Sequence, residues 1–145
     1  MSGSHTLASD LEQAYRKTIY RVLADSPFDL RVDRYSPELE AWHRTCGVSS
    51  SALITAANPR SQQLSDRENQ ARNRSMRGDL QSWTVLPTSS VDPDGKWPME
   101  PGLLIAGLGS ELAQQLSSRW GQIAWLQSEH AASPALMWTG VSSVR

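Results

Sequence analysis

Cysteine, lysine and long apolar runs are all scarce in this chain of 145 residues, and each scarcity is informative. Cys46 is the one cysteine, so no disulfide can form within the chain, which fits a reducing compartment. No stretch reaches the roughly 18 apolar residues that a membrane-spanning helix needs. The first nine residues lack a basic start followed by an apolar run, so we expect no secretory signal and a cytoplasmic location.

Net positive charge is also missing, because the formal charge at pH 7 is −1. Without a positive field the chain has little to attract nucleic acid or an anionic membrane, so we expect neither partner. Histidine is sparse as well, and His5, His43 and His130 are scattered along the chain. That distribution argues against a zinc or iron site, and we expect no metal and no cofactor.

The chain otherwise has the composition of an ordinary globular protein, with 39% hydrophobic and 20% charged residues. Its length suits one domain, which buries roughly 70% of the surface of the unfolded chain. We therefore predict a flexible segment over residues 1–9, a single domain over residues 10–140 and a tail over residues 141–145.

Apolar periodicity and terminal capping motifs, including the pair Ser9 and Glu12, predict four helices. They cover residues 10–24, 38–46, 65–80 and 110–120. Alternation or short apolar runs predict strands over residues 28–33, 51–57, 83–86, 102–108, 123–127 and 135–139. Residues 87–101, rich in Pro, Asp and Ser, are predicted as a long loop, and His130–Pro134 as the turn between the last two strands. The expected fold is an α+β sandwich with a mixed sheet of five or six strands and about four helices mostly on one face.

Polar residues gather where the predicted buried strand 51–57 ends. Thr55 and Asn58 stand at that end, and Ser61, Asn69 and Arg72 follow on the next loop and helix. Strand ends hold side chains rigidly, and the amino end of a helix offers free N–H groups, so an anion can dock beside Arg72. Alternatively, Asn58 caps a turn, Asn69 ties down the loop by amide hydrogen bonds, and Arg72 is solvated.

A second group lies at the end of the predicted loop, in Trp97-Pro-Met-Glu100. Trp97 can supply an aromatic wall, and desolvation can raise the pKa of Glu100, which is the only candidate general acid or base. The alternative is that Trp97 plugs the edge of the core and Glu100 pairs with an arginine. The turn Gly107–Ser110 is interpreted as a fold turn, because neither a third glycine nor a Walker lysine follows.

Several of these segments resemble those of a bacterial family named domain of unknown function 3293. The segments are Tyr15–Tyr20, Leu30-Arg31, Ala52–Pro59 with Ser61, Glu68-Asn69, Trp97–Glu100 and Gly121-Gln122. The similarity spans about residues 15–138, and the family pattern has a Ser where this chain has Gly102. The resemblance implies a shared fold and a shared polar set, and no activity.

Two hypotheses follow. In the first, a small anionic or nucleotide-like ligand binds a polar pocket, and enzyme activity stays open. The pocket residues are Thr55, Asn58, Ser61, Asn69, Arg72, Trp97, Glu100 and Gln122. In the second, an arginine-rich helix face binds a protein or RNA partner, and the polar set is a structural network. That face carries Arg60, Arg67, Arg72, Arg74 and Arg77.

Two structural predictions accompany these hypotheses. Asn58, Asn69 and Glu100 should lie in one cluster, because each stands at the end of a strand or helix. Cys46 should be largely buried and unreactive, because it ends a predicted helix, where the dipole disfavours a thiolate.

Overall fold

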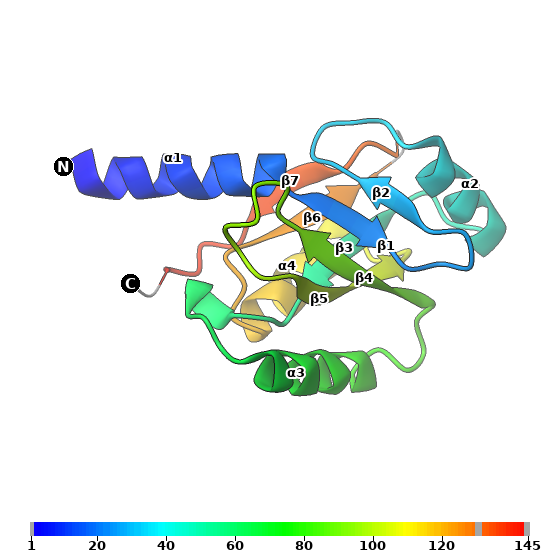
Figure 1. Cartoon of the computed structure of the whole chain (residues 1–145). Helices are drawn as coiled ribbons and strands as arrows, with labels where there is room; N and C mark the ends of the chain where they lie inside the picture. The colour runs from blue at the N-terminus through cyan, green and yellow to red at the C-terminus, as the bar shows by residue number, and fades with distance from the viewer. Residues whose placement is uncertain (1, 130–131, 144–145) are drawn as a thin grey trace.

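The computed structural model describes residues 2–129 and 132–143, which form one seven-stranded sheet with four α-helices (Figure 1). The helices are α1 (Ser2–Lys17), α2 (Pro37–Cys46), α3 (Asp66–Gly78) and α4 (Ser110–Arg119). The strands are β1 (Ile19–Val22), β2 (Phe28–Leu30), β3 (Ser51–Thr55), β4 (Val85–Val91), β5 (Glu100–Ala106), β6 (Ala124–Ser128) and β7 (Ala135–Trp138). A short 3-10 helix, η1 (Pro59–Ser61), follows β3.

The sheet confirms the α+β class and corrects two details of the expected fold. Its strand order is β2-β1-β4-β5-β3-β6-β7, which is seven strands where five or six were expected. Every neighbouring pair is antiparallel, so the sheet is not mixed. The sheet also curls into a half-barrel, which gives it a concave face.

The predicted first helix is wrong beyond residue 17, because β1 begins at Ile19. In β1, Tyr20 and Val22 are buried while Arg21 is exposed, a period of two that a helical reading of the same residues conceals. The helix also begins earlier than expected, at Ser2, so Ser9 lies inside it rather than at its cap. Residues 2–9, expected to be flexible, belong to α1.

The predicted loop over residues 87–101 is mostly a β-hairpin. β4 runs to Val91 and β5 starts at Glu100, with Ser90 opposite Glu100 and Thr88 opposite Gly102. Proline and serine are poor strand formers, but β4 is paired on both sides, with β1 and with β5, and this tertiary pairing outweighs local propensity.

Local capping signals predicted the other helices well. The Ser36 hydroxyl accepts from the Leu39 N–H at 3.0 Å at the start of α2, and Gly47 ends that helix with a φ of 71°. Ser65 and Glu68 form the expected capping box of α3.

Helices cover both faces of the sheet, in contrast to the expectation of mostly one. α3 contacts β5, and α4 contacts β3 and β6, on the face that buries Ile54, Ile105 and Met76. The other face carries Leu39 and Trp42 of α2. α1 projects beyond the sheet at the upper left of Figure 1, and only its last turns reach the strands.

The face covered by α2 changes character along the strands. One row across five strands consists of leucines, which are Leu86, Leu104, Leu53, Leu126 and Leu136. The next row is Val22, Thr88, Gly102 and Thr55, and the one after it is Tyr20, Ser90 and Glu100. Toward the end of the sheet nearest α1, this face therefore turns from apolar to polar.

Cys46 is half-buried rather than largely buried, and burial raises the pKa of its thiol, which keeps the thiol protonated at neutral pH. Within the described part of the chain, no helix is long and apolar enough to cross a membrane. The predicted turn His130–Pro134 begins with two residues that lie outside the described ranges.

Candidate ligand-binding site

The loop after β3 has an unusual backbone. Asn58, Arg60 and Ser61 all have positive φ values, of 48°, 54° and 62°, although none is glycine. Such conformations cost energy for residues with a Cβ atom, so other contacts must hold them. Backbone bonds supply part of that hold, since the Arg60 N–H donates to the Gly121 carbonyl at 2.7 Å and the Ser61 N–H to the Asn58 carbonyl at 3.0 Å.

Asn58 is the centre of the contacts that fix this loop. Its N–H donates to Asn69 Oδ1 at 2.9 Å, and Asn69 Nδ2 donates back to Asn58 Oδ1 at 2.9 Å. Asn58 Oδ1 also accepts from the Leu64 N–H at 2.8 Å, and Asn58 Nδ2 donates to Glu100 Oε2 at 2.5 Å. The predicted cluster of Asn58, Asn69 and Glu100 is confirmed.

Arg72 is neither solvated nor placed to hold an anion. Its Nε donates to the Ala56 carbonyl at 2.6 Å, and one of its terminal nitrogens donates to the Trp120 carbonyl at 2.8 Å. The guanidinium also lies over the Trp120 ring, 5.3 Å from its centre. Arg72 therefore joins the loop after β3 to the end of α4.

The amino end of α3 is also a poor anion site. Its first turn carries Asp66 and Glu68, and the capping box occupies the Glu68 N–H. Two carboxylates beside the helix start repel an anion that the helix dipole alone would attract.

The Gly121-Gln122 pair completes the same scaffold. Gly121 has a φ of 73°, and a Cβ atom there would lie 2.9 Å from Pro59 Cβ. Gln122 is buried, and its Nε2 donates to the Ala57 carbonyl at 3.0 Å and to the Trp120 carbonyl at 3.2 Å. A glycine is therefore needed where the loop after α4 packs against the loop after β3.

A cavity of about 220 Å³ lies at the polar end of the face described above. Six of the eight predicted site residues line it, and these are Thr55, Asn58, Ser61, Trp97, Glu100 and Gln122. Asn69 and Arg72 do not line it, and they instead hold its wall from behind. The Thr55 hydroxyl is used within the protein, where it donates to the Pro101 carbonyl at 2.7 Å and accepts from the Ala57 N–H at 2.9 Å.

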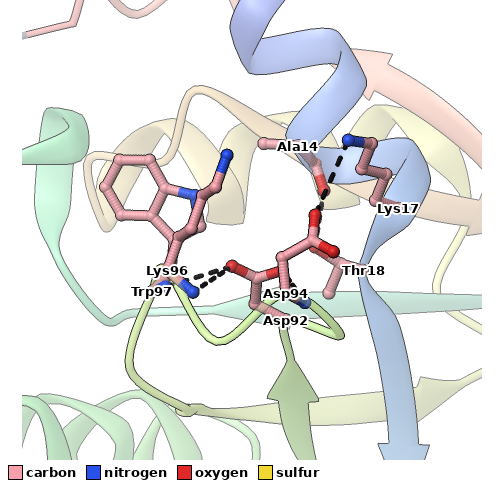
Figure 2. Close-up of polar contacts among 7 residues, drawn as sticks. All are labelled: Ala14, Lys17, Thr18, Asp92, Asp94, Lys96 and Trp97. Carbon is pink, nitrogen blue, oxygen red and sulfur yellow. Dashed lines mark hydrogen bonds and ion pairs between the residues drawn. The ribbon is translucent and has the colours of Figure 1, made fainter.

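The last turns of α1 and the tip of the β4–β5 hairpin form the rim of the cavity. Figure 2 shows the Lys17 amine directed at the Asp94 carboxylate, and the two groups are 3.6 Å apart. The Asp92 carboxylate accepts three backbone N–H groups of the hairpin tip, from Asp94, Lys96 and Trp97. These bonds order the tip and place the indole of Trp97, which is 63% exposed, at the rim.

Glu100 is the electrostatic centre of the cavity. Burial raises the pKa of its carboxyl, and the hydrogen bond from Asn58 offsets part of that rise. Only Oε2 is engaged by the described residues, because no hydrogen bond from them reaches Oε1. Burial also raises the pKa of Tyr15 and of Tyr20, with the nearby Glu100 carboxylate as a further cause, so both phenols are neutral.

The cavity also has lining residues that were not predicted as site residues, and Tyr15, Tyr20, Ser90 and Asp92 are among them. Tyr15 and Tyr20 lie in the first segment of the family resemblance, and that signal could have found them. The sequence predicted one continuous helix through Tyr15 and Tyr20. In the structure Tyr15 lies on α1 and Tyr20 on β1, and both line the cavity. In the described part of the chain, no three His, Cys, Asp or Glu residues form a group that could hold a metal ion.

Residues 54–124 match the family described as "Protein of unknown function (DUF3293)". This match, over nearly half of the chain, supports the family that its motifs predicted. The matched segment runs from the end of β3 to the first residue of β6 and includes every predicted site residue. Comparisons with curated proteins and with solved structures found no match.

Proposed function

We propose that this chain is a small-molecule-binding domain whose ligand occupies the cavity beside Glu100. The observation that carries the proposal is the half-buried carboxyl group of Glu100, which lines the cavity with one oxygen bonded to Asn58 and the other without a hydrogen bond from the described residues. Ligand pockets combine apolar walls with a few polar groups that orient the ligand, so a carboxyl oxygen left open beside a cavity is suited to a ligand that donates a hydrogen bond.

Two features of the surrounding structure support this proposal. The loop that forms one wall holds three non-glycine residues at positive φ, and strain of this kind is concentrated at ligand sites. Asn58, Asn69 and Arg72 fix that loop by hydrogen bonds, so the wall is organised before a ligand arrives.

The size of the cavity indicates a small ligand. Pockets for drug-sized molecules measure roughly 300–1,000 Å³, and this one is about 220 Å³. The charge of the lining does not support the anionic ligand expected from the sequence, because Arg72 is engaged elsewhere and no Lys, Arg or His is among the described lining residues. The phosphate of a nucleotide would have no cationic partner there.

The proposal covers binding and no reaction. Among the described lining residues there is no His, Cys or Lys, and Asp92 is engaged by three backbone N–H groups, so Glu100 stays the candidate for proton transfer.

In the alternative hypothesis, in which an arginine-rich face binds a partner, fewer arginines are available than the sequence suggested. Arg72 is turned inward, and Arg60 Nε donates to the Ser142 carbonyl at 3.1 Å. Arg67, Arg74 and Arg77 stay exposed on α3. Loss of a partner on substitution of these three, with no small molecule stabilising the protein, would favour that alternative.

The test fills the cavity without disturbing the scaffold. Ser90 lines the cavity from β4, between Tyr20 and Glu100 in the same row, and Ser90→Phe places a ring in that space. Ser89→Phe is the matched control, because successive residues of a strand point to opposite faces. We expect metabolites that raise the Tm of the wild type and of Ser89→Phe to have no effect on Ser90→Phe. The proposal would be refuted if the metabolites stabilise all three proteins equally. It would also be refuted if no metabolite stabilises the wild type.

A further inference from the structure

The charge and the aromatic character of the cavity lining indicate which class of small molecule binds there. This inference rests on the proposed function. Two residues that line the cavity are acidic, Asp92 and Glu100, and no basic residue is among the described ones. Both Asp92 oxygens already accept backbone N–H groups of the hairpin tip, three in all, so most of the acceptor capacity of Asp92 is used within the protein. Glu100 Oε1 is therefore the charged acceptor that faces a ligand.

Aromatic residues line the same cavity as this carboxyl group. Tyr15 reaches the cavity from α1, Tyr20 from β1 and Trp97 from the hairpin tip. Aromatic faces carry partial negative charge and attract cations, while their apolar area favours an organic body over a hydrated metal ion. The electronegative faces and the carboxyl group thus select the same sign of charge.

The ring of Tyr15 is held by a contact outside the cavity. Tyr15 packs edge-on against Trp138, with ring centres 5.8 Å apart, and this contact ties the end of α1 to β7. Arg16, which follows Tyr15 in α1, forms an ion pair of 2.6 Å with Asp33. The lysine of α1, Lys17, is directed at Asp94 of the hairpin tip (Figure 2), and it is not among the residues that line the cavity.

We propose that the ligand is a small organic ammonium ion, whose N–H groups bond to Glu100 Oε1 and whose charge lies among the rings of Tyr15, Tyr20 and Trp97. A primary or secondary ammonium group supplies the donor that the open carboxyl oxygen lacks. An anion of the same size would meet Glu100 and Asp92 with no cation among the described lining residues to attract it.

Three probes of matched shape test the charge: benzylammonium, benzyl alcohol and benzoate. Each is added to the wild-type protein at the same millimolar concentration and constant ionic strength, and the Tm is measured. We expect a concentration-dependent rise with benzylammonium, a smaller one with benzyl alcohol and none with benzoate. A rise with benzoate or benzyl alcohol that equals or exceeds that with benzylammonium overturns the ammonium class but leaves the binding cavity in place.

Two charge-removing variants assign the effect to one carboxyl group. Glu100→Gln keeps an oxygen that accepts from Asn58 Nδ2, and we expect its affinity for benzylammonium to fall at least about tenfold. Glu111→Gln is the matched control, because Glu111 is exposed in the first turn of α4 and does not line the cavity. Equal losses in the two variants would show only general attraction to a negative surface and would overturn the proposal.

The cavity-filling variant separates this inference from the proposed function. Benzylammonium should lose its effect on Ser90→Phe and keep it on Ser89→Phe. If no probe stabilises the wild type, while uncharged or anionic metabolites do so and lose the effect in Ser90→Phe, the cavity binds a ligand and the ammonium class is wrong. If no compound of any charge binds, both proposals are wrong.

Discussion

Asn69→Ala removes the side chain that holds the strained loop after β3 against α3. Asn69 is 4% exposed, and its amide makes two hydrogen bonds of 2.9 Å with Asn58, one to the backbone N–H and one to the side-chain oxygen. The variant loses both, and the Asn58 N–H is left without its partner. Asn58 Oδ1 keeps the bond from Leu64, so the damage is confined to one end of the network.

The size of the effect follows from these two bonds. A net hydrogen bond contributes about 0.5–1.5 kcal/mol, and a buried donor left unpaired costs about 1–3 kcal/mol. We expect a loss of about 1–3 kcal/mol in the free energy of unfolding, because part of the loop can reach solvent and recover one bond with water. In a chain of this length each kcal/mol lowers the Tm by about 2–4 °C.

Urea denaturation of the wild type, Asn69→Ala and Asn73→Ala measures this loss against a matched control. Asn73 lies one turn further along α3 and is half-buried, but its Oδ1 accepts no hydrogen bond from the described residues. Its truncation should change stability by no more than about 0.5 kcal/mol. Equal effects of the two substitutions would refute the view that Asn69 clamps the loop.

Two further predictions concern the loop after α4 and the cavity carboxyl. Gly121→Ala should lower stability by about 1–3 kcal/mol, through backbone strain and a clash with Pro59. Gly95→Ala is the control for backbone strain alone, because Gly95 has a φ of 68° and no atom lies within 4 Å of an added Cβ. Equal losses of stability in the two variants would show that the contact with Pro59 costs nothing. Because burial raises the folded-state pKa of Glu100, wild-type stability should fall as pH rises from about 4.5 through that raised pKa. Glu100→Gln should lack this fall. If the difference in unfolding free energy between the wild type and Glu100→Gln is the same at every pH, the fall does not come from Glu100.

The elements that the sequence predicted best are those with local signals. The caps at Ser36 and Ser65 act over three residues, and the buried strand at Ser51–Thr55 is a continuous apolar run. β1 and most of β4 were missed because their stability comes from partners far along the chain. Tyr20 pairs with Ser90, which is 70 residues further along the chain, and the residues next to Tyr20 in the sequence do not indicate this pairing.

The candidate site was predicted in part for the same reason. Polar residues at the end of a buried strand are visible in the sequence, and Asn58 and Glu100 are indeed joined by a hydrogen bond. The sequence does not reveal that Arg72 turns inward, because its partners are backbone carbonyls, which every residue possesses. Nor does it show that Tyr15 lies over the cavity, since that depends on how the end of α1 docks against Trp138.

The residues of the polar set thus divide by what their chemistry requires. Asn58, Asn69 and Gln122 each use their amides on partners within the protein, and architecture alone accounts for them. Glu100 is different, because an uncharged glutamine could accept the same bond from Asn58 without the cost of burying a carboxylate. A scaffold needs no charge at this position. In the proposed function, a ligand that enters the cavity pairs with this charge, and for that reason the open oxygen of Glu100 carries the proposal.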